Sequence, residues 1–247
     1  MKRKDFLHLT AICSTGLLTI PFNAIGAPQD RFTKAQLIGK GNPDITGNSY
    51  TQKMHKQTKV AFLKMKAAAA KENIIIETVS AYRSFERQKE IFEGKYKRFT
   101  RQGLSPKQAL SKIIEYSTIP GTSRHHWGTD IDIIQGNTQD RPLSVLQEKH
   151  FYGQGAFCGL KVWLTKNAST FGFYEVYTKD ANRKGFYHEP WHFSYKPISK
   201  PMLMAYKKLD IKSILQQEKI AGSEHFTDSF IEKYIKEHML DINPELL

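Results

Sequence analysis

Two histidines and a glutamate stand within five residues, in the stretch HEPWH at positions 188–192. The spacing fits H-E-x-x-H, which on a helix places two zinc-binding histidines one turn apart beside a glutamate that activates water. Pro190 opposes that helix, because a proline in a helix interior costs about 3 kcal/mol and clashes with the preceding turn. The residues that follow, FSYKP, are typical of a strand. We therefore predict a loop that enters a strand and presents Glu189 and His192.

A second group of potential metal ligands lies in SRHHWGTDID, residues 123–132, which contains His125, His126, Asp130 and Asp132. One imidazole and one carboxylate from this segment, together with His192, would give three protein ligands and leave a fourth position for water, as in catalytic zinc sites. Glu189 would then be placed to take a proton from that water. Because Asp130 and Asp132 share one face of a strand, Asp130 is either an outer partner of the site or a competing ligand.

The pattern S-x-H-x-x-G-x-x-x-D followed by E-x-W-H resembles the zinc D,D-carboxypeptidases of bacterial cell walls. These are the VanY-like D-alanyl-D-alanine carboxypeptidases, which are related to L,D-carboxypeptidases and to the hedgehog-type fold. The element S-x-Y-R-S-x-x-x-Q and the stretch WLTKNASTFGFY are also similar to the family, so that the resemblance spans roughly residues 50–197. The three motifs comprise Ser80, Tyr82, Arg83, Ser84 and Gln88; then Ser123, His125, Gly128 and Asp132; then Glu189, Trp191 and His192.

This resemblance implies a role for each matching residue. His125, Asp132 and His192 would bind zinc, and Glu189 would be the general base. Arg83 would hold the substrate's carboxylate or the developing oxyanion, which suits the planar donor fork of a guanidinium. The remaining expected substrate-binding residues are Gln88, Ser123 and Trp191. His126, Trp127 and Trp191 are expected to pack around the site without reacting, and the role of His188, a spare histidine beside the motif, is left open.

The element pattern predicts an α+β fold, with a small mixed or antiparallel sheet flanked by helices, similar to hedgehog and D,D-peptidase folds. We expect helices over 50–71, from Phe85, after Ser105-Pro106 and around 158–169, the last ended by Gly172. Strands are expected at 74–79, where the β-branched run indicates burial, and at 130–134, 173–177 and 191–195. From Pro197 the chain is expected to be mostly helical, with Thr227 as a cap.

The first residues have a basic start, an apolar middle and small residues at the end, which is the order of a secretory signal peptide. We therefore divide the chain into a signal peptide (1–27), a polar leader (28–48), a metallopeptidase domain (49–197) and a helical C-terminal extension packed on that domain (198–247). The protein is predicted to be exported, periplasmic or associated with the cell wall, without a membrane span after signal cleavage.

The composition adds expectations about partners and isolated side chains. The net charge of +13 falls to +11 without residues 2–5, which favours anionic partners such as cell-envelope polymers, although general solubility explains it equally well. No basic block with interleaved aromatic residues indicates nucleic-acid binding.

Cys158 is expected to be a buried structural thiol. The four histidines outside the motifs are expected at the surface: His55, His150, His225 and His238.

The predicted function is removal of the C-terminal D-alanine from peptidoglycan stem peptides. An L,D-carboxypeptidase and an endopeptidase that cuts peptide crosslinks would use the same site. A non-catalytic zinc-containing wall-binding protein is a further alternative, but a structural zinc site needs neither Glu189 nor Arg83.

Overall fold

A four-stranded antiparallel sheet forms the centre of the fold, with the strand order β3-β4-β6-β5. The structure is a computed structural model that describes residues 31–247, so the predicted signal peptide lies outside the described residues. The strands are β3 (Ile76–Ser80), β4 (Asp130–Gln135), β6 (His192–Tyr195) and β5 (Phe173–Glu175). The expected α+β architecture is confirmed, and the sheet is antiparallel throughout.

Strand register brings the two halves of the predicted site together. Asp132 in β4 pairs with His192 in β6 on one side and with Ser80 in β3 on the other. Residues directly opposite each other on antiparallel strands have their Cβ atoms about 4.5–5.5 Å apart and on the same face. The register therefore places the carboxylate of Asp132 beside the imidazole of His192, although 60 positions separate them in the sequence.

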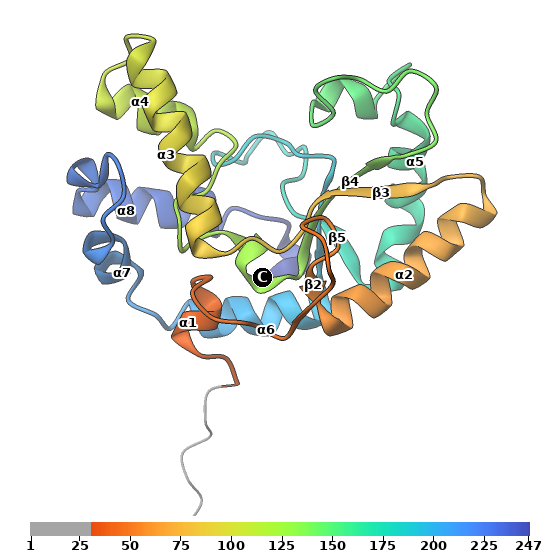
Figure 1. The fold of residues 1–247 in the computed structure, drawn as a ribbon, viewed down its shortest axis with the longest axis horizontal. Coiled ribbons are helices and arrows are strands. Elements are labelled where there is room, and N and C mark those ends of the chain that lie inside the picture. The colour runs from red at the N-terminus through yellow and green to blue at the C-terminus, as the bar shows by residue number, and fades with distance from the viewer. Residues whose placement is uncertain (1–30) are drawn as a thin grey trace, which may run out of the picture. The chain divides into compact units, whose positions relative to one another are not determined.

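Alternation along β4 separates the site from the core. Ile131 and Ile133 are fully buried in an apolar cluster with Phe62 of α2 (Lys56–Lys71) and Leu160 of α5 (Cys158–Asn167). Figure 1 shows α2 and α5 beside these strands. Because successive side chains of a strand point to opposite faces, the side chains of Asp130 and Asp132 point away from this cluster.

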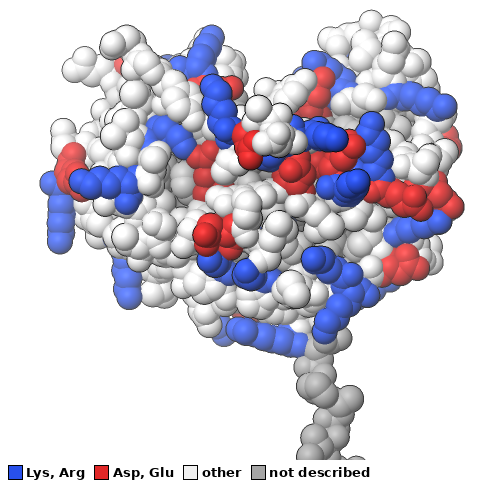
Figure 2. All heavy atoms as spheres, turned by 180° about the vertical axis from the view of Figure 1, so that it is seen from behind, with Lys and Arg blue, Asp and Glu red and all other residues white. Residues whose placement is uncertain are grey.

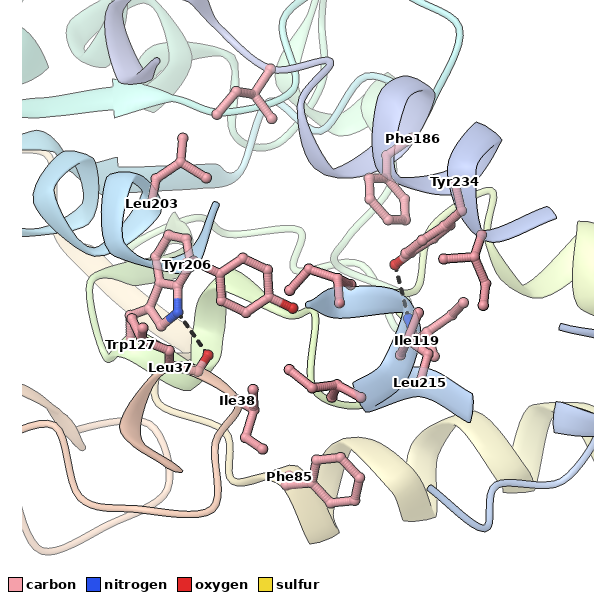
Figure 3. Packing of buried hydrophobic residues seen from close by; sticks show 14 of the residues in the cluster. Leu37, Ile38, Phe85, Ile119, Trp127, Phe186, Leu203, Tyr206, Leu215 and Tyr234 are labelled. Atoms are coloured by element: carbon pink, nitrogen blue, oxygen red, sulfur yellow. Dashed lines mark hydrogen bonds between the residues drawn. The ribbon is translucent and has the colours of Figure 1, made fainter. Parts of the chain in front are cut away.

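The remaining helices surround the other face with a second core. They are α1 (Lys34–Leu37), α3 (Phe85–Arg101), α4 (Pro106–Ile113), α6 (Lys196–Tyr206), α7 (Ile211–Gln217) and α8 (Asp228–Tyr234). Trp127 packs between Leu203 and Tyr206 of α6, and its Nε1–H donates to the carbonyl of Leu37 at 3.0 Å (Figure 3). Segments from the predicted leader and the predicted C-terminal extension thus contribute to one core, and Phe32–Leu247 forms one compact unit.

Several helix ends follow the expected capping chemistry. Ser84 and Ser105 accept hydrogen bonds from the first turns of α3 and α4, and Thr227 caps α8 in the same way. Gly172 has φ 80°, the left-handed conformation predicted for the end of the α5 segment. No helix among residues 31–247 is long and apolar enough to span a bilayer.

Other expectations were wrong in their boundaries. The helix expected from Tyr50 begins at Lys56, because Met54 and His55 form β2 and pair with β1 (Ile45–Thr46). The strand expected at 74–79 is β3, an edge strand that is only partly buried, and Ile75 before it is 44% exposed. The strand expected over 173–177 ends at Glu175, and Trp191 precedes β6.

Three side chains also differ from the expected burial. His55 is buried and accepts a hydrogen bond from the Gln57 amide at the start of α2, and His238 is buried against Phe186 and Tyr234. Cys158 is only partly buried at the start of α5. A tertiary contact determines burial in each case, and the local sequence does not show it.

Candidate metal centre

Three potential metal ligands converge on the face of β4 that lies opposite the cluster of Ile131 and Ile133. His125 lies in a 3₁₀ turn (Arg124–Trp127), Asp132 lies in β4, and His192 opens β6. His125 Nε2 lies 3.5 Å from Asp132 Oδ2, and His192 Nδ1 lies 3.8 Å from Asp132 Oδ1. The three ligand atoms all lie within 4.8 Å of one another, and all three residues are buried. This is the set of residues that the sequence motifs brought together.

Each histidine is oriented by a hydrogen bond on its other ring nitrogen. His125 Nδ1–H donates to the carbonyl of Ala81 at 2.7 Å, which leaves Nε2 to face Asp132. His192 Nε2 lies 3.1 Å from Asp130 Oδ1, so Nε2–H donates there and Nδ1 faces Asp132. Such outer partners fix the tautomer and the ring orientation of metal-binding histidines.

Asp130 is therefore an outer partner of the site, one of the two alternatives that the sequence left open. Its carboxylate accepts hydrogen bonds from Arg124 Nε at 2.9 Å, Thr129 Oγ1 at 2.7 Å and Ser194 Oγ at 2.8 Å. Burial alone would raise the pKa of Asp130, but Arg124 and His192 outweigh burial and hold that pKa well below its usual range. Asp130 thus stays ionised and keeps an acceptor next to His192.

Glu189 reaches the same centre from a tight turn. The His192 amide donates to the Glu189 carbonyl at 3.0 Å, and the chain enters β6 directly after this turn. The predicted loop is confirmed, and HEPWH is not a helix. Glu189 Oε2 lies 3.0 Å from His192 Nδ1, and its side chain also faces the cavity in front of the three ligands.

The electrostatics of the cluster suit a cation. Burial lowers the pKa of His125 well below its usual value, which favours the neutral imidazole that binds metals. Burial raises the pKa of Asp132 to about 6, and the charge of Glu189 adds to this. Burial alone would lower the pKa of His192, but the carboxylates of Asp130, Glu189 and Asp132 raise it to about 10. Three carboxylates around one histidine attract positive charge, which a proton or a divalent metal ion supplies.

A second observation supports a metal ligand at Asp132. Its Oδ1 atom is buried and has no hydrogen-bond partner within residues 31–247. Buried polar atoms are normally paired, so an orphaned carboxylate oxygen beside two oriented histidines fits a bound cation. Mixed histidine and carboxylate ligation with three protein ligands is the arrangement of catalytic zinc.

Arg83 is held in place by the other residues of its motif. Its Nη1–H donates to Gln88 Oε1 at 2.7 Å and its Nη2–H donates to Ser80 Oγ at 2.9 Å. Gln88 is fully buried, does not line the cavity, and donates from Nε2 to the carbonyl of Thr118 at 2.7 Å. Gln88 therefore positions Arg83, while Arg83 itself faces the cavity.

A cavity of ≈ 500 Å³ opens in front of the metal centre. One wall comes from α3 and the segment after α4, and the other from residues 144–148. Figure 2 shows a notch between these two parts of the surface, at the upper edge of the molecule. The cavity is lined by Arg83, Ser123, His125, Asp132, Glu189, Trp191 and His192, and it also reaches residues that the motifs did not indicate: Ile91, Lys95, Thr118, Arg124 and Tyr177.

The spare histidines of the two motifs do not join the ligand set. His126 accepts from the Gly121 amide at Nε2 and donates from Nδ1 to the carbonyl of Arg83 at 2.6 Å. Burial lowers the pKa of His126 to about 4, so it is a neutral link between these two segments. His188 forms a hydrogen bond with Tyr152 Oη at 2.9 Å.

Comparison with known proteins assigns the chain to one family. The family model described as "VanY: D-alanyl-D-alanine carboxypeptidase" matches residues 51–198. The chain belongs to the VanY family. The match begins before β2 and ends within α6, so it contains each residue of the metal centre.

Two individual relatives match parts of the chain. A D-alanyl-D-alanine carboxypeptidase of Enterococcus faecalis is 27% identical over 153 residues, which cover 62% of this chain and 52% of that protein. The chain therefore spans about half the length of that relative. An uncharacterized protein of Haemophilus influenzae is 28% identical over 123 residues, which cover 49% of this chain and 93% of that protein.

Solved VanY-family structures have the same fold. VanYB in complex with D-alanine-D-alanine superposes with a TM-score of 0.53 at 23% identity, covering 73% of this chain and 92% of that one. A vancomycin-resistance D,D-pentapeptidase VanY variant in complex with Zn(II) gives a TM-score of 0.51 at 22% identity, covering 69% and 88%. At these identities the likeness concerns the fold alone.

Proposed function

We propose that this protein is an exported zinc carboxypeptidase that removes the C-terminal D-alanine from peptidoglycan stem peptides. The observation that carries the proposal is the convergence of His125, Asp132 and His192 at one end of a cavity that Glu189 and Arg83 also face. Membership of the VanY family supports a peptidase, and VanYB has been solved with D-alanine-D-alanine bound.

The chain's own residues can carry out each part of the hydrolysis. Zinc held by the three ligands would supply Lewis-acid chemistry, since it polarises a carbonyl oxygen and lowers the pKa of water. Glu189 takes the proton of the attacking water and then protonates the leaving amine. Arg83, fixed by Ser80 and Gln88, donates to the oxygen on which negative charge develops.

Ser123 is available to the peptide. Ser123 lines the cavity, and its buried Oγ atom has no hydrogen-bond partner within the described part of the chain. Trp191 forms part of the cavity wall and is supported from behind by Phe151, at a ring-centroid distance of 5.8 Å. A rigid aromatic wall and a free hydroxyl are suited to fixing the orientation of a short peptide.

The basic composition supports attraction to the anionic polymers of the cell envelope. On the face in Figure 2, Lys and Arg lie among Asp and Glu and do not gather into one patch. We therefore expect diffuse, salt-sensitive attraction, and not a dedicated polymer-binding site.

Mass spectrometry of a pentapeptide stem ending in D-Ala-D-Ala tests the proposal. Purified protein is incubated with the peptide and zinc, with and without a chelator. Loss of one alanine that is blocked by chelator and restored by zinc is the expected result. Cleavage of only a tetrapeptide or a crosslinked dimer would replace the proposal with an L,D-carboxypeptidase or an endopeptidase. Binding to sacculi without any cleavage would replace it with a wall-binding protein.

A further inference from the structure

One face of α3 forms a wall of the cavity. Gln88, Ile91 and Lys95 follow one another at helical spacing, so they lie on one stripe of the helix. Gln88 is buried behind Arg83, whereas Ile91 and Lys95 line the cavity. Because side chains on a helix tilt toward its N-terminus, the Lys95 ammonium is directed back toward the end of α3 where Gln88 holds Arg83.

Lys95 has no ion-pair partner among the described residues. It makes no ion pair or hydrogen bond within residues 31–247, although its side chain is partly buried. Burial and the nearby charge of Arg83 lower the pKa of Lys95, while Glu189 acts in the opposite direction. Holding two cations near each other in a partly buried cavity is unfavourable, and the charge of Glu189 offsets this only in part, because the pKa of Lys95 is still lowered. A ligand that supplies an anion removes this cost.

Thr118 lines the same cavity. Its Oγ1 atom is buried and has no hydrogen-bond partner in the described structure. The carbonyl of Thr118 accepts a hydrogen bond from Gln88 Nε2, so this residue is tied to the same stripe of α3 as Lys95. A residue with an unused donor and a residue with an unpaired cation thus line the cavity from adjacent segments.

We propose that Lys95 and Thr118 form a subsite for a carboxylate group of the peptide, separate from the position of Arg83. The inference rests on the proposed function, because it takes the bound ligand to be a peptide. An ammonium supplies a point charge and a hydroxyl supplies one donated hydrogen bond, which together suit a carboxylate. The carboxylate comes either from the C-terminus of the peptide or from an acidic residue within the stem.

Calorimetric binding of stem peptides tests this subsite without requiring turnover. The protein carries Glu189→Gln so that the peptide survives, and three peptides are compared: the parent, its C-terminal amide, and the parent with the internal acidic residue amidated. Lys95→Met is expected to raise the Kd of the parent about tenfold. Thr118→Val should weaken binding less, and Lys95→Arg should retain most of the affinity. Lys97→Met is the matched control, because Lys97 is exposed on the same helix.

Each amidated peptide lacks one carboxylate. If Lys95→Met no longer changes the Kd of one amidated peptide, the carboxylate that this peptide lacks is the one that the subsite binds. Equal Kd values for the parent protein, Lys95→Met and Lys97→Met on the parent peptide would overturn the subsite. Equal weakening on all three peptides would also overturn it, since the effect would then not depend on a carboxylate. A protein that binds these peptides through Lys95 but releases no alanine would contradict the proposed reaction and leave the subsite standing.

Discussion

At the scale of single residues, the metal centre is built from groups whose protonation states depend on one another. His192 touches three carboxylates, of which one orients its Nε2 and two face its Nδ1. In the absence of a metal ion a proton on His192 balances this negative charge. A divalent cation that takes the same place must displace the proton, so its binding is coupled to pH.

The first prediction separates the base from the ligands. Glu189→Ala is expected to keep zinc binding and to abolish turnover, because Glu189 faces the cavity but lies outside the three-residue ligand group. His192→Ala should lose zinc, because it removes one of three ligands. Metal analysis of the purified variants and alanine release from the pentapeptide provide the two readings. Turnover in Glu189→Ala would remove this residue from the mechanism, and a full zinc complement in His192→Ala would break the ligand assignment.

The second prediction concerns the support behind His192. Asp130→Asn is expected to weaken zinc binding about 10–100-fold, since it removes the charged acceptor that fixes the ring of His192 and leaves Arg124 without its counter-ion. Competition with a chromogenic chelator measures the affinity. Asp228→Asn, an exposed aspartate on α8 paired with Lys212, is the control and should bind zinc as the unchanged protein does. Equal affinity in both variants would show that Asp130 is not needed for orientation.

The sequence predicted the metal centre better than its surroundings. Residue types and spacing indicated a metal site with His192 and Glu189, and the resemblance to a family selected His125 and Asp132, which the structure brings together with His192. Lys95, Thr118 and Tyr177 were missed, since nothing in their local sequence distinguishes them from surface or core residues. They reach the cavity through helix and loop packing, which short motifs do not encode.

At the scale of elements, the start of a helix was predicted correctly where the local sequence contains a capping residue or a proline. The cap at Ser105 and the proline at Pro106 placed the start of α4 correctly, and the helix expected from Phe85 is α3. The start of α2 was wrong, because the apolar residues before Lys56 are held in β2 by pairing with Ile45–Thr46. A helical periodicity gives no information on strand pairing with a distant segment. Here the pairing, and not the periodicity, determines the structure of residues 54–55.

The third prediction concerns the turn between two ligands. Gly128 has φ 66°, and a Cβ atom there would lie 2.3 Å from Ile45 Cδ1 and 2.7 Å from the backbone nitrogen of His55. Gly128→Ala is therefore expected to destabilise the fold by more than about 2 kcal/mol and to weaken zinc binding, since the turn connects His125 to β4.

Gly94→Ala provides the opposite comparison. Gly94 lies in the interior of α3, and a Cβ atom there meets nothing within 4 Å. Alanine should stabilise the fold by about 0.5–1 kcal/mol, because it restricts the unfolded chain and favours the helix. Denaturant unfolding of Gly128→Ala and Gly94→Ala measures both free energies of unfolding. Similar unfolding midpoints for the two variants would contradict the predicted difference between the two glycine positions.

At the scale of the whole molecule, the C-terminal residues support one wall of the cavity. Tyr234 Oη accepts a hydrogen bond from the Ile119 amide at 3.0 Å and lies 2.7 Å from Thr122 Oγ1 (Figure 3 shows Tyr234 beside Ile119). These bonds hold the segment that leads into Ser123. Phe186 packs against both Tyr234 and His238 and also lines the cavity. The last helices thus stabilise residues that face the site, although no motif assigned them a role.

The fourth prediction is a dependence of stability on pH that arises in this C-terminal packing. Burial lowers the pKa of His238 from its usual 6.5 to about 4; Glu237 and Asp241 oppose this shift, while Lys233 and Arg183 add to it. The unfolded chain therefore binds a proton on this residue at a higher pH than the folded protein does. The stability that the neutral ring contributes is complete above about pH 6.5 and is lost as the pH falls toward 4.

Thermal unfolding at pH 7 and pH 5 tests this contribution. His238→Phe keeps an aromatic ring against Phe186 and Tyr234 but removes the titrating group. Its Tm should fall about 3 °C less than that of the unchanged protein between the two pH values, since about 1 kcal/mol of the loss is removed. His225→Phe is the control, because His225 is more exposed and lies beside Glu224. A fall in His238→Phe as large as in the control would place the acid sensitivity elsewhere in the fold.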